Sequence, residues 1–340
     1  MLERKLLSTR NNLAILLVLF LSTSCSLLPK KECIVTRAAF DIGSGSTKMT
    51  VAKVNSCENK LVEILFEDQS AVPYKQSLYK NANSFSDEVI SLGIKELTEL
   101  KLNAIDIGAT EFSALATQAF RDAKNGSETL RKLEKETDIE INVITQTLEA
   151  RFGFLGTKIK HPFDESDKIL VWDIGGGSMQ MTYFKDGKYH HYLGTLASVS
   201  FKEKVLERFY PNDTNTPNPI GKSRSKKATI LSRFFAHGNV PSDIKKYIEK
   251  ARVFGIGGVH YYSLRKQALK KGHIYNQTQL RVALKKRSKL NDRKIGGKYA
   301  KTEVTNIALV LGFMEALGVR KVETLKVNMS HGLFLDEKSW

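Results

Sequence analysis

The sequence predicts an α/β protein whose two domains face each other across a cleft. Three observations support this class. The chain has 340 residues, which is enough for two domains with a core each. Strand-like and helix-like segments alternate along it. A glycine-rich motif also occurs twice, first at Asp41 and again 132 residues later at Asp173, each time between two apolar strand-like segments.

We expect the first domain to cover residues 34–160, after a short tether at residues 25–33. Hydrophobic periodicity and turn residues predict its elements in this order: strands 35–42, 48–54 and 61–68, helix 86–101, strand 112–117, helix 127–136, strand 141–145 and helix 148–158. The acidic, proline-containing segment 161–167 then predicts a linker.

The second domain is expected to cover residues 168–340 and to begin with the second glycine-rich motif. Three prolines between residues 210 and 221 indicate a surface loop. The pattern after this loop predicts helices 225–236, 241–251, 259–271, 276–287 and 302–317, and a closing strand at 321–328.

The net charge of +17 lies in one segment. Residues 222–294 hold 20 lysines and arginines against three acids, so the rest of the chain sums to zero. Such a segment attracts polyanions, whether nucleic acid, anionic lipid or a polyphosphorylated substrate, although a run of lysines also occurs as a plain solvated surface. The hydrophobic content of 41% excludes a disordered chain.

The first 24 residues predict an export signal. Three basic residues precede the apolar run 13–21, which is too short to span a bilayer, and small residues follow it. Cys25 then resembles the lipid-attachment site of a bacterial lipoprotein, although Ser22 stands where that pattern prefers leucine. We therefore expect a membrane-anchored protein on the periplasmic side. An uncleaved signal that tethers the chain to the inner membrane is the alternative.

Cys33 and Cys57 flank the predicted hairpin of the first domain. Their mean position falls on Gly45 in its turn, and paired residues of a hairpin share a constant sum. In an oxidising compartment this placement predicts a disulfide. A slip of one residue would instead leave two unpaired thiols on opposite faces.

The repeated motif has the chemistry of a phosphate-binding loop. Glycines expose backbone N–H groups, and hydroxyl side chains add further donors. An aspartate at the end of each preceding strand, Asp41 or Asp173, is suited to hold Mg²⁺ through water. Ordinary hairpin turns are the alternative. The candidate phosphate-binding residues are Gly43, Ser44, Gly45, Ser46, Thr47, Lys48, Gly175, Gly176, Gly177 and Ser178.

Four further segments, 116–126, 149–151, 193–198 and 254–258, complete a family resemblance. Together with the two loops they resemble the Ppx/GppA phosphatases, which are exopolyphosphatases and guanosine pentaphosphate phosphohydrolases within the superfamily of sugar kinases, heat-shock chaperones and actin. The resemblance implies two actin-like (ribonuclease H-like) α/β domains with a phosphate-binding cleft between them.

The resemblance also implies roles for single residues. Glu149 matches the catalytic glutamate that deprotonates the attacking water, and Arg121 matches a phosphate-binding arginine. Asp41 and Asp173 match the acids that handle Mg²⁺ or another divalent cation. Gln180 stands where the family has an acid; its amide can orient water or metal but cannot take a proton. The third glycine turn of the family matches Gly255, Gly257 and Gly258.

Without the resemblance, the sequence predicts that Glu149 is a solvated helix residue. It also predicts that Arg121 forms a surface ion pair with Asp122 or Glu128. The histidines lack the spacing of metal ligands.

The favoured function is metal-dependent release of terminal phosphate from polyphosphate. One alternative is a nucleoside tri- or diphosphate or guanosine pentaphosphate phosphohydrolase, with Tyr261 and Tyr262 as candidates for base stacking. Another is an exported protein of weakened activity that binds polyanions. Nucleic acid is a less favoured partner, and a homodimer is left open.

Overall fold

The computed structural model describes residues 33–340 except 59, 211–214 and 270. The predicted export signal and Cys25 lie outside the described residues. Contacts divide the chain into residues 1–34 and residues 35–340, and the fold below is that of the second unit. Within the described residues, no helix has the length and hydropathy needed to cross a membrane. Cys33 and Cys57 are both disulfide-bonded.

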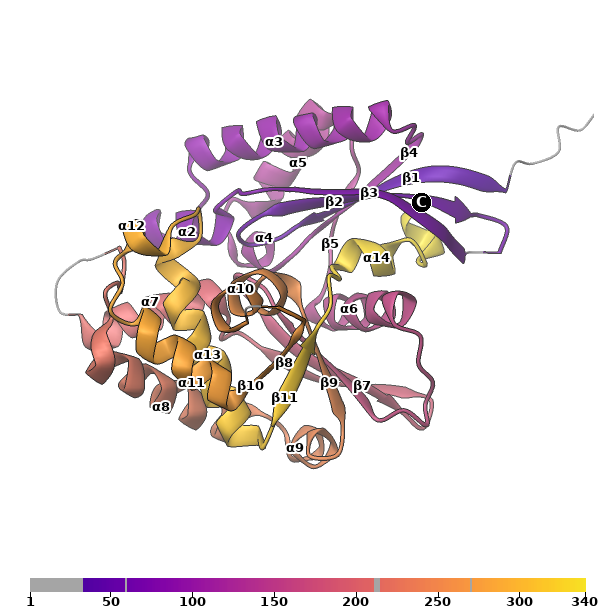
Figure 1. Cartoon of the computed structure of the whole chain (residues 1–340). Coiled ribbons are helices and arrows are strands. Elements are labelled where there is room, and N and C mark those ends of the chain that lie inside the picture. The colour runs from indigo at the N-terminus through magenta and orange to yellow at the C-terminus, as the bar shows by residue number, and fades with distance from the viewer. Residues whose placement is uncertain (1–32, 59, 211–214, 270) are drawn as a thin grey trace, which may run out of the picture. The chain divides into compact units, whose positions relative to one another are not determined.

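The first lobe is built on a five-stranded sheet with the order β3-β2-β1-β4-β5 (Figure 1). Helices α3 and α5 cover one face of this sheet, and side chains such as Phe40 and Leu97 fill the core between them. The bounds are β1 (Ile34–Ile42), β2 (Thr47–Asn55), β3 (Lys60–Ser70), α2 (Tyr74–Lys80), α3 (Asp87–Asp106), β4 (Glu111–Ala116), α4 (Gln118–Asp122), α5 (Gly126–Thr137) and β5 (Ile141–Val143).

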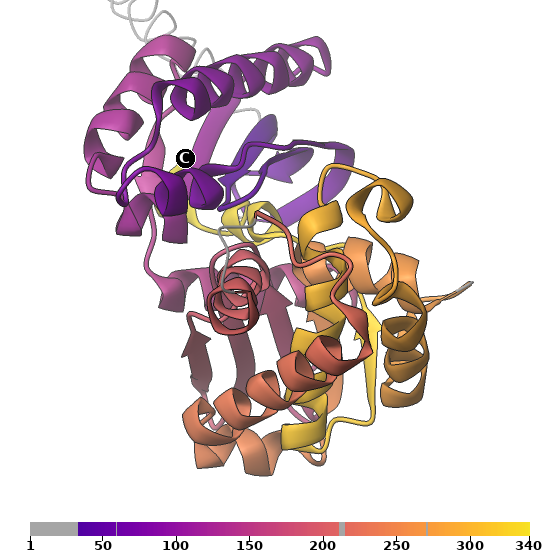
Figure 2. The ribbon, with the colours of Figure 1, turned by 90° about the vertical axis from the view of Figure 1, so that its left-hand side faces the viewer.

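The second lobe is built on a six-stranded sheet with the order β10-β11-β9-β6-β7-β8. Helix α13 lies at the centre of its helical layer and packs on α7, α8 and α11 (Figure 2). The bounds are β6 (Ile169–Ile174), β7 (Met179–Lys185), β8 (Lys188–Gly194), α7 (Ser198–Phe209), α8 (Gly221–Asn239), α9 (Ser242–Ile248), β9 (Arg252–Ile256), a π-helical turn η1 (Val259–Leu264), α10 (Arg265–Ala268), β10 (Ile274–Asn276), α11 (Gln277–Arg287), α12 (Asp292–Ile295), α13 (Ala300–Leu317) and β11 (Lys321–Thr324).

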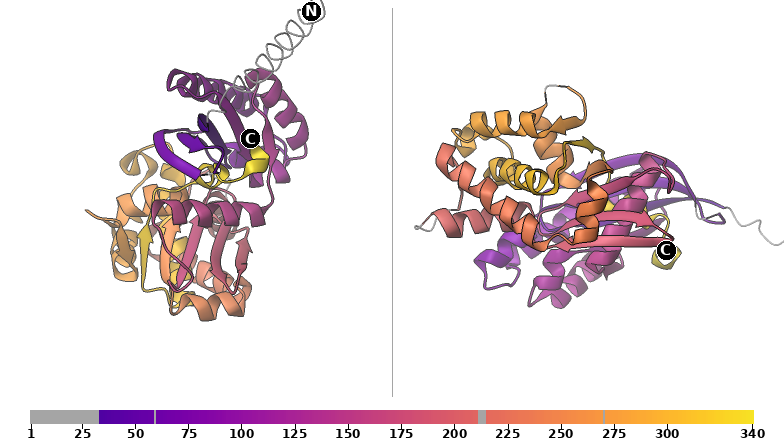
Figure 3. Two further views of the ribbon diagram at one scale, coloured as in Figure 1. Left: turned by 90° about the vertical axis from the view of Figure 1, so that its right-hand side faces the viewer. Right: turned by 90° about the horizontal axis from the view of Figure 1, so that it is seen from below.

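Helix α6 (Gln146–Lys160) lies between the two sheets (Figures 1 and 3). Phe152 packs into the core below the first sheet, and Phe154 packs into the core below the second. These two side chains are two positions apart, so they leave the helix on opposite sides. Thr145 caps the helix by accepting a hydrogen bond from the N–H of Leu148. One helix therefore positions its first turn relative to both lobes.

The C-terminal segment returns to the first lobe. Strand β11 ends at Thr324, earlier than predicted, and α14 (Met329–Leu333) packs on α6 and β2. The Ser330 hydroxyl lies 2.7 Å from that of Thr50, and Phe334 is buried beneath the first sheet. The chain then forms a 3₁₀ turn, η2 (Glu337–Ser339). This path differs from the predicted assignment of residues 168–340 to one domain, because α6 covers only part of the inner face of the first sheet and α14 completes the cover.

Most predicted elements are found within a few residues of their expected bounds, but several short elements were not predicted and one predicted helix is irregular. The helix expected at 259–271 is the π-helical turn η1 followed by α10. The glycine turn before it forces this irregular start, since Gly257 has a φ of +78°. Helices α2 and α7 were not predicted, and both cover strand ends near the loops described next.

Candidate active site

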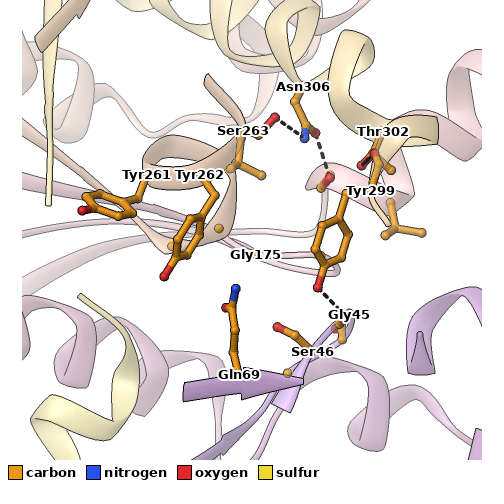
Figure 4. A pocket seen from close by; sticks show the side chains of 18 of the residues that line it. Gly45, Ser46, Gln69, Gly175, Tyr261, Tyr262, Ser263, Tyr299, Thr302 and Asn306 are labelled. Carbon is orange, nitrogen blue, oxygen red and sulfur yellow. Dashed lines mark hydrogen bonds between the residues drawn. The ribbon is translucent and has the colours of Figure 1, made fainter. Parts of the chain in front are cut away.

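A cavity of about 1080 Å³ brings the predicted motifs together (Figure 4). It is lined by both glycine-rich loops, by Glu149 from α6 and by Gly257 and Gly258 after β9. Tyr262 and Tyr299, from the second lobe, face Ser46 and Gln69 from the first. The cavity is therefore made by segments that lie far apart in the sequence.

The two loops adopt the same turn. In the first, the N–H of Gly43 donates to the carbonyl of Ser46 at 2.9 Å, and in the second the N–H of Gly175 donates to the carbonyl of Ser178 at 3.0 Å. Each turn joins two neighbouring strands of a sheet, β1 to β2 and β6 to β7. The repeat seen in the sequence is thus a repeat in backbone geometry.

The loop tips also lie against each other. A side chain at Gly176 would come within 3.2 Å of the Ser44 Cβ, and one at Gly177 would come within 2.5 Å of the Ser44 hydroxyl. A side chain at either position would press on the first loop, which fills the space beside them. The N–H groups of both loops consequently border one small volume.

Glu149 lies in the first turn of α6 and is only 2% exposed. Two donors bind its Oε2 atom at 3.1 Å, the Arg121 guanidinium and the Gln180 amide. Both hydrogen bonds are made to Oε2. No donor among the described residues binds Oε1. Burial raises the pKa of Glu149 to about 7, although Arg121 lowers it. A carboxyl group with such a pKa is suited to accept a proton near neutral pH.

The two aspartates of the loops differ in their neighbours. Asp41 is fully buried and binds the Lys48 ammonium through Oδ2 at 2.7 Å. Its Oδ1 atom is buried and has no hydrogen-bond partner among the described residues. Asp173 has no such cation, and burial raises its pKa to about 6, with Lys48 lowering it and Asp41 raising it further. Both carboxyl groups line the cavity.

Three predicted residues lie outside the cavity lining. The Arg121 guanidinium donates to Glu149, to the Gln118 side chain and to the Ile144 carbonyl, so its donors are directed to protein groups. Thr47 is buried in β2. Gly255 is buried in β9, where a side chain would collide with His260.

His260 is itself fully buried, and burial lowers its pKa to about 3, so this ring is neutral and structural. The described residues contain no cluster of three His, Cys, Asp or Glu side chains placed to hold a metal ion.

The cavity also contains residues that sequence reasoning missed. Lys202 is 3% exposed and comes from α7, whose N–H groups at Ser198 and Val199 donate to carbonyls of the second loop. Tyr299 precedes α13, and its hydroxyl donates to the Gly45 carbonyl at 3.4 Å. Neither residue belongs to a motif. The one local indication that Tyr299 follows a loop was the pair of glycines at 296 and 297.

The basic segment is divided between two places. Of residues 222–294, Arg265, Lys266 and Lys271 line the cavity, together with Lys298 and Lys301 beyond the segment. Residues of α8, α9 and α11 are not in the lining. Most of the basic segment therefore lies outside the cavity lining.

Comparison with solved structures defines the class of protein. The fold matches a Ppx/GppA enzyme from Aquifex aeolicus with a TM-score of 0.66 and 20% identity, covering 90% of this chain and 98% of that one. An exopolyphosphatase from Cytophaga hutchinsonii matches with a TM-score of 0.68 and 15% identity, over 87% and 96% of the two chains. The protein thus has the two-domain actin-like α/β fold.

Residues 50–338 match the model of the Ppx/GppA phosphatase family. The chain belongs to that family. It is 31% identical over 198 residues to a bifunctional 3-dehydroquinate synthase/phosphatase from Fusobacterium nucleatum, covering 52% of this chain and 27% of the relative. It is 35% identical over 89 residues to exopolyphosphatase 1 of Mycobacterium tuberculosis, 26% of each chain. The chain therefore spans about a quarter of the length of these curated relatives.

Proposed function

We propose that the protein hydrolyses a terminal phosphoanhydride bond and acts as an exopolyphosphatase. The observation that carries this proposal is the environment of Glu149. A buried carboxyl with a pKa of about 7 borders the same cavity as two apposed loops of phosphate-binding type. The cavity is also lined by Arg265, Lys266, Lys271, Lys298 and Lys301, which complement a substrate with several negative charges.

The residues divide the work of the reaction. Backbone N–H groups and hydroxyls of the two loops bind the terminal phosphoryl group, and the cavity lysines bind the phosphates behind it. Arg121 and Gln180 hold Oε2 of Glu149, so that Oε1 accepts the proton of the attacking water. Lys48 and Lys202 offset negative charge as the bond to the leaving phosphate breaks.

The two loop aspartates fit a hard divalent cation such as Mg²⁺. Asp41 offers a buried Oδ1 atom without a partner among the described residues, and Asp173 offers a carboxylate with no cation beside it. When bound between these carboxylates and water, the cation would neutralise charge on the phosphoryl oxygens.

A second candidate is a nucleoside phosphate substrate. Tyr262 and Tyr299 are 44% and 45% exposed and border the cavity, where an aromatic ring of a base would stack. Tyr261, the other predicted stacking residue, also lines it.

Phosphate release from long-chain polyphosphate, tripolyphosphate, ATP and guanosine pentaphosphate, each with and without Mg²⁺, tests the proposal. Glu149→Gln is expected to lower the rate about 1000-fold, since it removes the base and keeps the shape of the side chain. Glu128→Gln is the matched control, because Glu128 also lies in the first turn of a helix but outside the cavity. A Glu149→Gln protein as fast as the wild type would refute the mechanism, and binding without turnover would favour the polyanion-binding alternative.

We also propose export and lipid attachment at Cys25, on the sequence features of residues 1–25. A Cys25→Ala protein is expected to move from the membrane fraction to the soluble periplasmic fraction. Unchanged membrane fractionation with an uncleaved N-terminus would favour the inner-membrane tether instead.

A further inference from the structure

Helices α8 and α11 carry much of the positive charge of the chain, yet they do not line the cavity. Residues 221–239 and 277–294, here named the outer basic face, contain twelve lysines and arginines and a single acid, Asp292. Asp292 is already bound by Thr216 and by the Asn218 side chain. The proposed reaction leaves this charge without a role.

The two helices of the outer basic face lie side by side and run in opposite directions. At one end, the N–H of Gly221 donates to the carbonyl of Ser288 at 2.8 Å. Further along, Arg233 of α8 and Arg281 of α11 both pair with Glu315 of α13, at 3.9 and 2.9 Å. The helices are held rigidly on α13, where a side chain at Gly312 would collide with the α8 backbone.

The charges of this face point to solvent. Lys226 and Lys227 on α8 and Lys285 and Lys286 on α11 are exposed, and none of them forms an ion pair within the described part of the chain. Close lysines repel one another, so a folded surface that gathers them gains from an anionic partner.

Apolar side chains accompany the charge. Phe234 is 68% exposed, the most exposed large hydrophobic side chain among the described residues, and Val282 is 49% exposed. Each lies about 100° around its helix from the arginine that binds Glu315, on the side opposite the buried residues of that helix, so both side chains point away from α13. An aromatic and an aliphatic side chain amid lysines are typical of surfaces that enter the headgroup region of a bilayer. A valine offers nothing for a nucleic-acid base to stack on.

We propose that the outer basic face docks on a membrane surface rich in anionic lipid. The lysines bind the headgroup phosphates, and Phe234 and Val282 enter the boundary with the acyl chains. This site is independent of the proposed catalytic activity.

The full-length protein is tested with vesicles of phosphatidylcholine alone and with vesicles of phosphatidylcholine in which about a third of the lipid is phosphatidylglycerol, which gives the surface a negative potential. The N-terminal segment carries basic residues of its own but is the same in every variant, so the change in the ratio of the two partition coefficients between variants reports the outer basic face. Each basic residue at an anionic surface contributes about fivefold. The variant Lys226→Glu/Lys227→Glu/Lys285→Glu/Lys286→Glu is therefore expected to lower the ratio more than about 100-fold. Phe234→Ser is expected to lower binding to the anionic vesicles about fivefold.

The matched control changes four exposed lysines of the first lobe to glutamate. It is expected to keep most of the wild-type ratio of partition coefficients. These lysines are Lys80, Lys124, Lys132 and Lys135. Hydrogen exchange of peptides from α8 and α11 should slow with anionic vesicles and not with neutral ones. If the variant with the four lysine-to-glutamate changes in α8 and α11 still hydrolyses tripolyphosphate, its fold is intact. Equal loss in the control variant, or protection of α8 and α11 by DNA or polyphosphate but not by vesicles, would overturn the proposal.

Discussion

The two glycine-rich loops share a turn but differ in how they hold their aspartates. The first loop ends in Lys48, whose ammonium neutralises Asp41 at 2.7 Å. The second ends in Gln180, which bonds to Glu149, and Asp173 forms no ion pair among the described residues, although Lys48 is near enough to lower its pKa. Instead, Asp173 packs against the backbone of Gly257, where an added Cβ would lie 2.2 Å from its Oδ1. The repeat has thus kept its backbone while the two copies have taken different electrostatic roles.

The aspartates of the two loops therefore differ in their electrostatic state. Asp41 is paired with a cation, whereas Asp173 can gain or lose a proton near neutral pH. The paired Asp41 and Lys48 form a closed ionic contact that is mostly buried. Asp173 and Glu149, whose pKa values are raised to about 6 and about 7, change protonation in the range where an enzyme works. Under the proposed mechanism we therefore expect the first loop to act mainly in binding and the second to be coupled to the proton transfer.

The largest expected effect is that of breaking the pair in the first loop. Lys48→Met leaves the buried Asp41 charge uncompensated and is expected to lower the free energy of unfolding by about 3 kcal/mol. Asp173→Asn should cost little or raise stability, because it removes an unpaired buried charge. Urea denaturation measures both. In the double variant Lys48→Met/Asp41→Asn the loss should be smaller than in Lys48→Met alone; strictly additive losses would show that the two side chains do not act as a pair.

A smaller effect is expected where the second loop meets the third glycine turn. Gly257→Ala forces a side chain into a positive φ and into Asp173, and is expected to cost about 2 kcal/mol. The adjacent Gly258→Ala is the control. Gly258 has a φ of −62° and open space around it, so its stability should change by less than about 0.5 kcal/mol. Equal thermal shifts in the two variants would argue against the packing of Asp173 on this turn.

The smallest expected effect is a shift in the pH dependence of kcat/KM. Glu149 must be ionised to accept a proton, so kcat/KM should fall as the pH drops below about 7. Gln180→Glu places a second carboxyl within about 3 Å of the first, which raises the apparent pKa of the pair and should move the acidic limb up by about one pH unit. Gln180→Leu, which adds no charge, is the comparison. An acidic limb that stays in place in Gln180→Glu would mean that residue 180 does not govern the ionisation of Glu149.

Short local patterns predicted the fold class and both loops, because these depend on residues adjacent in sequence, whereas Glu149 was identified only through the family resemblance. The sequence could not predict that Arg121 binds Glu149 and lies outside the cavity lining. Both facts depend on where α6 lies between the sheets. Lys202 and Tyr299 were missed for the same reason. Burial also reverses the ordinary expectation for Glu149, which as an isolated helix residue would be solvated.

The return of α14 to the first sheet also constrains the order of assembly. Thr50 and Ser330 meet across 280 positions of the chain, and Leu333 and Phe334 complete the hydrophobic layer below strands made near the start of synthesis. Contacts of such sequence separation form late. During translation the part of this apolar face that α6 does not cover therefore stays exposed until almost the whole second lobe has emerged, and it is there that a chaperone would be needed.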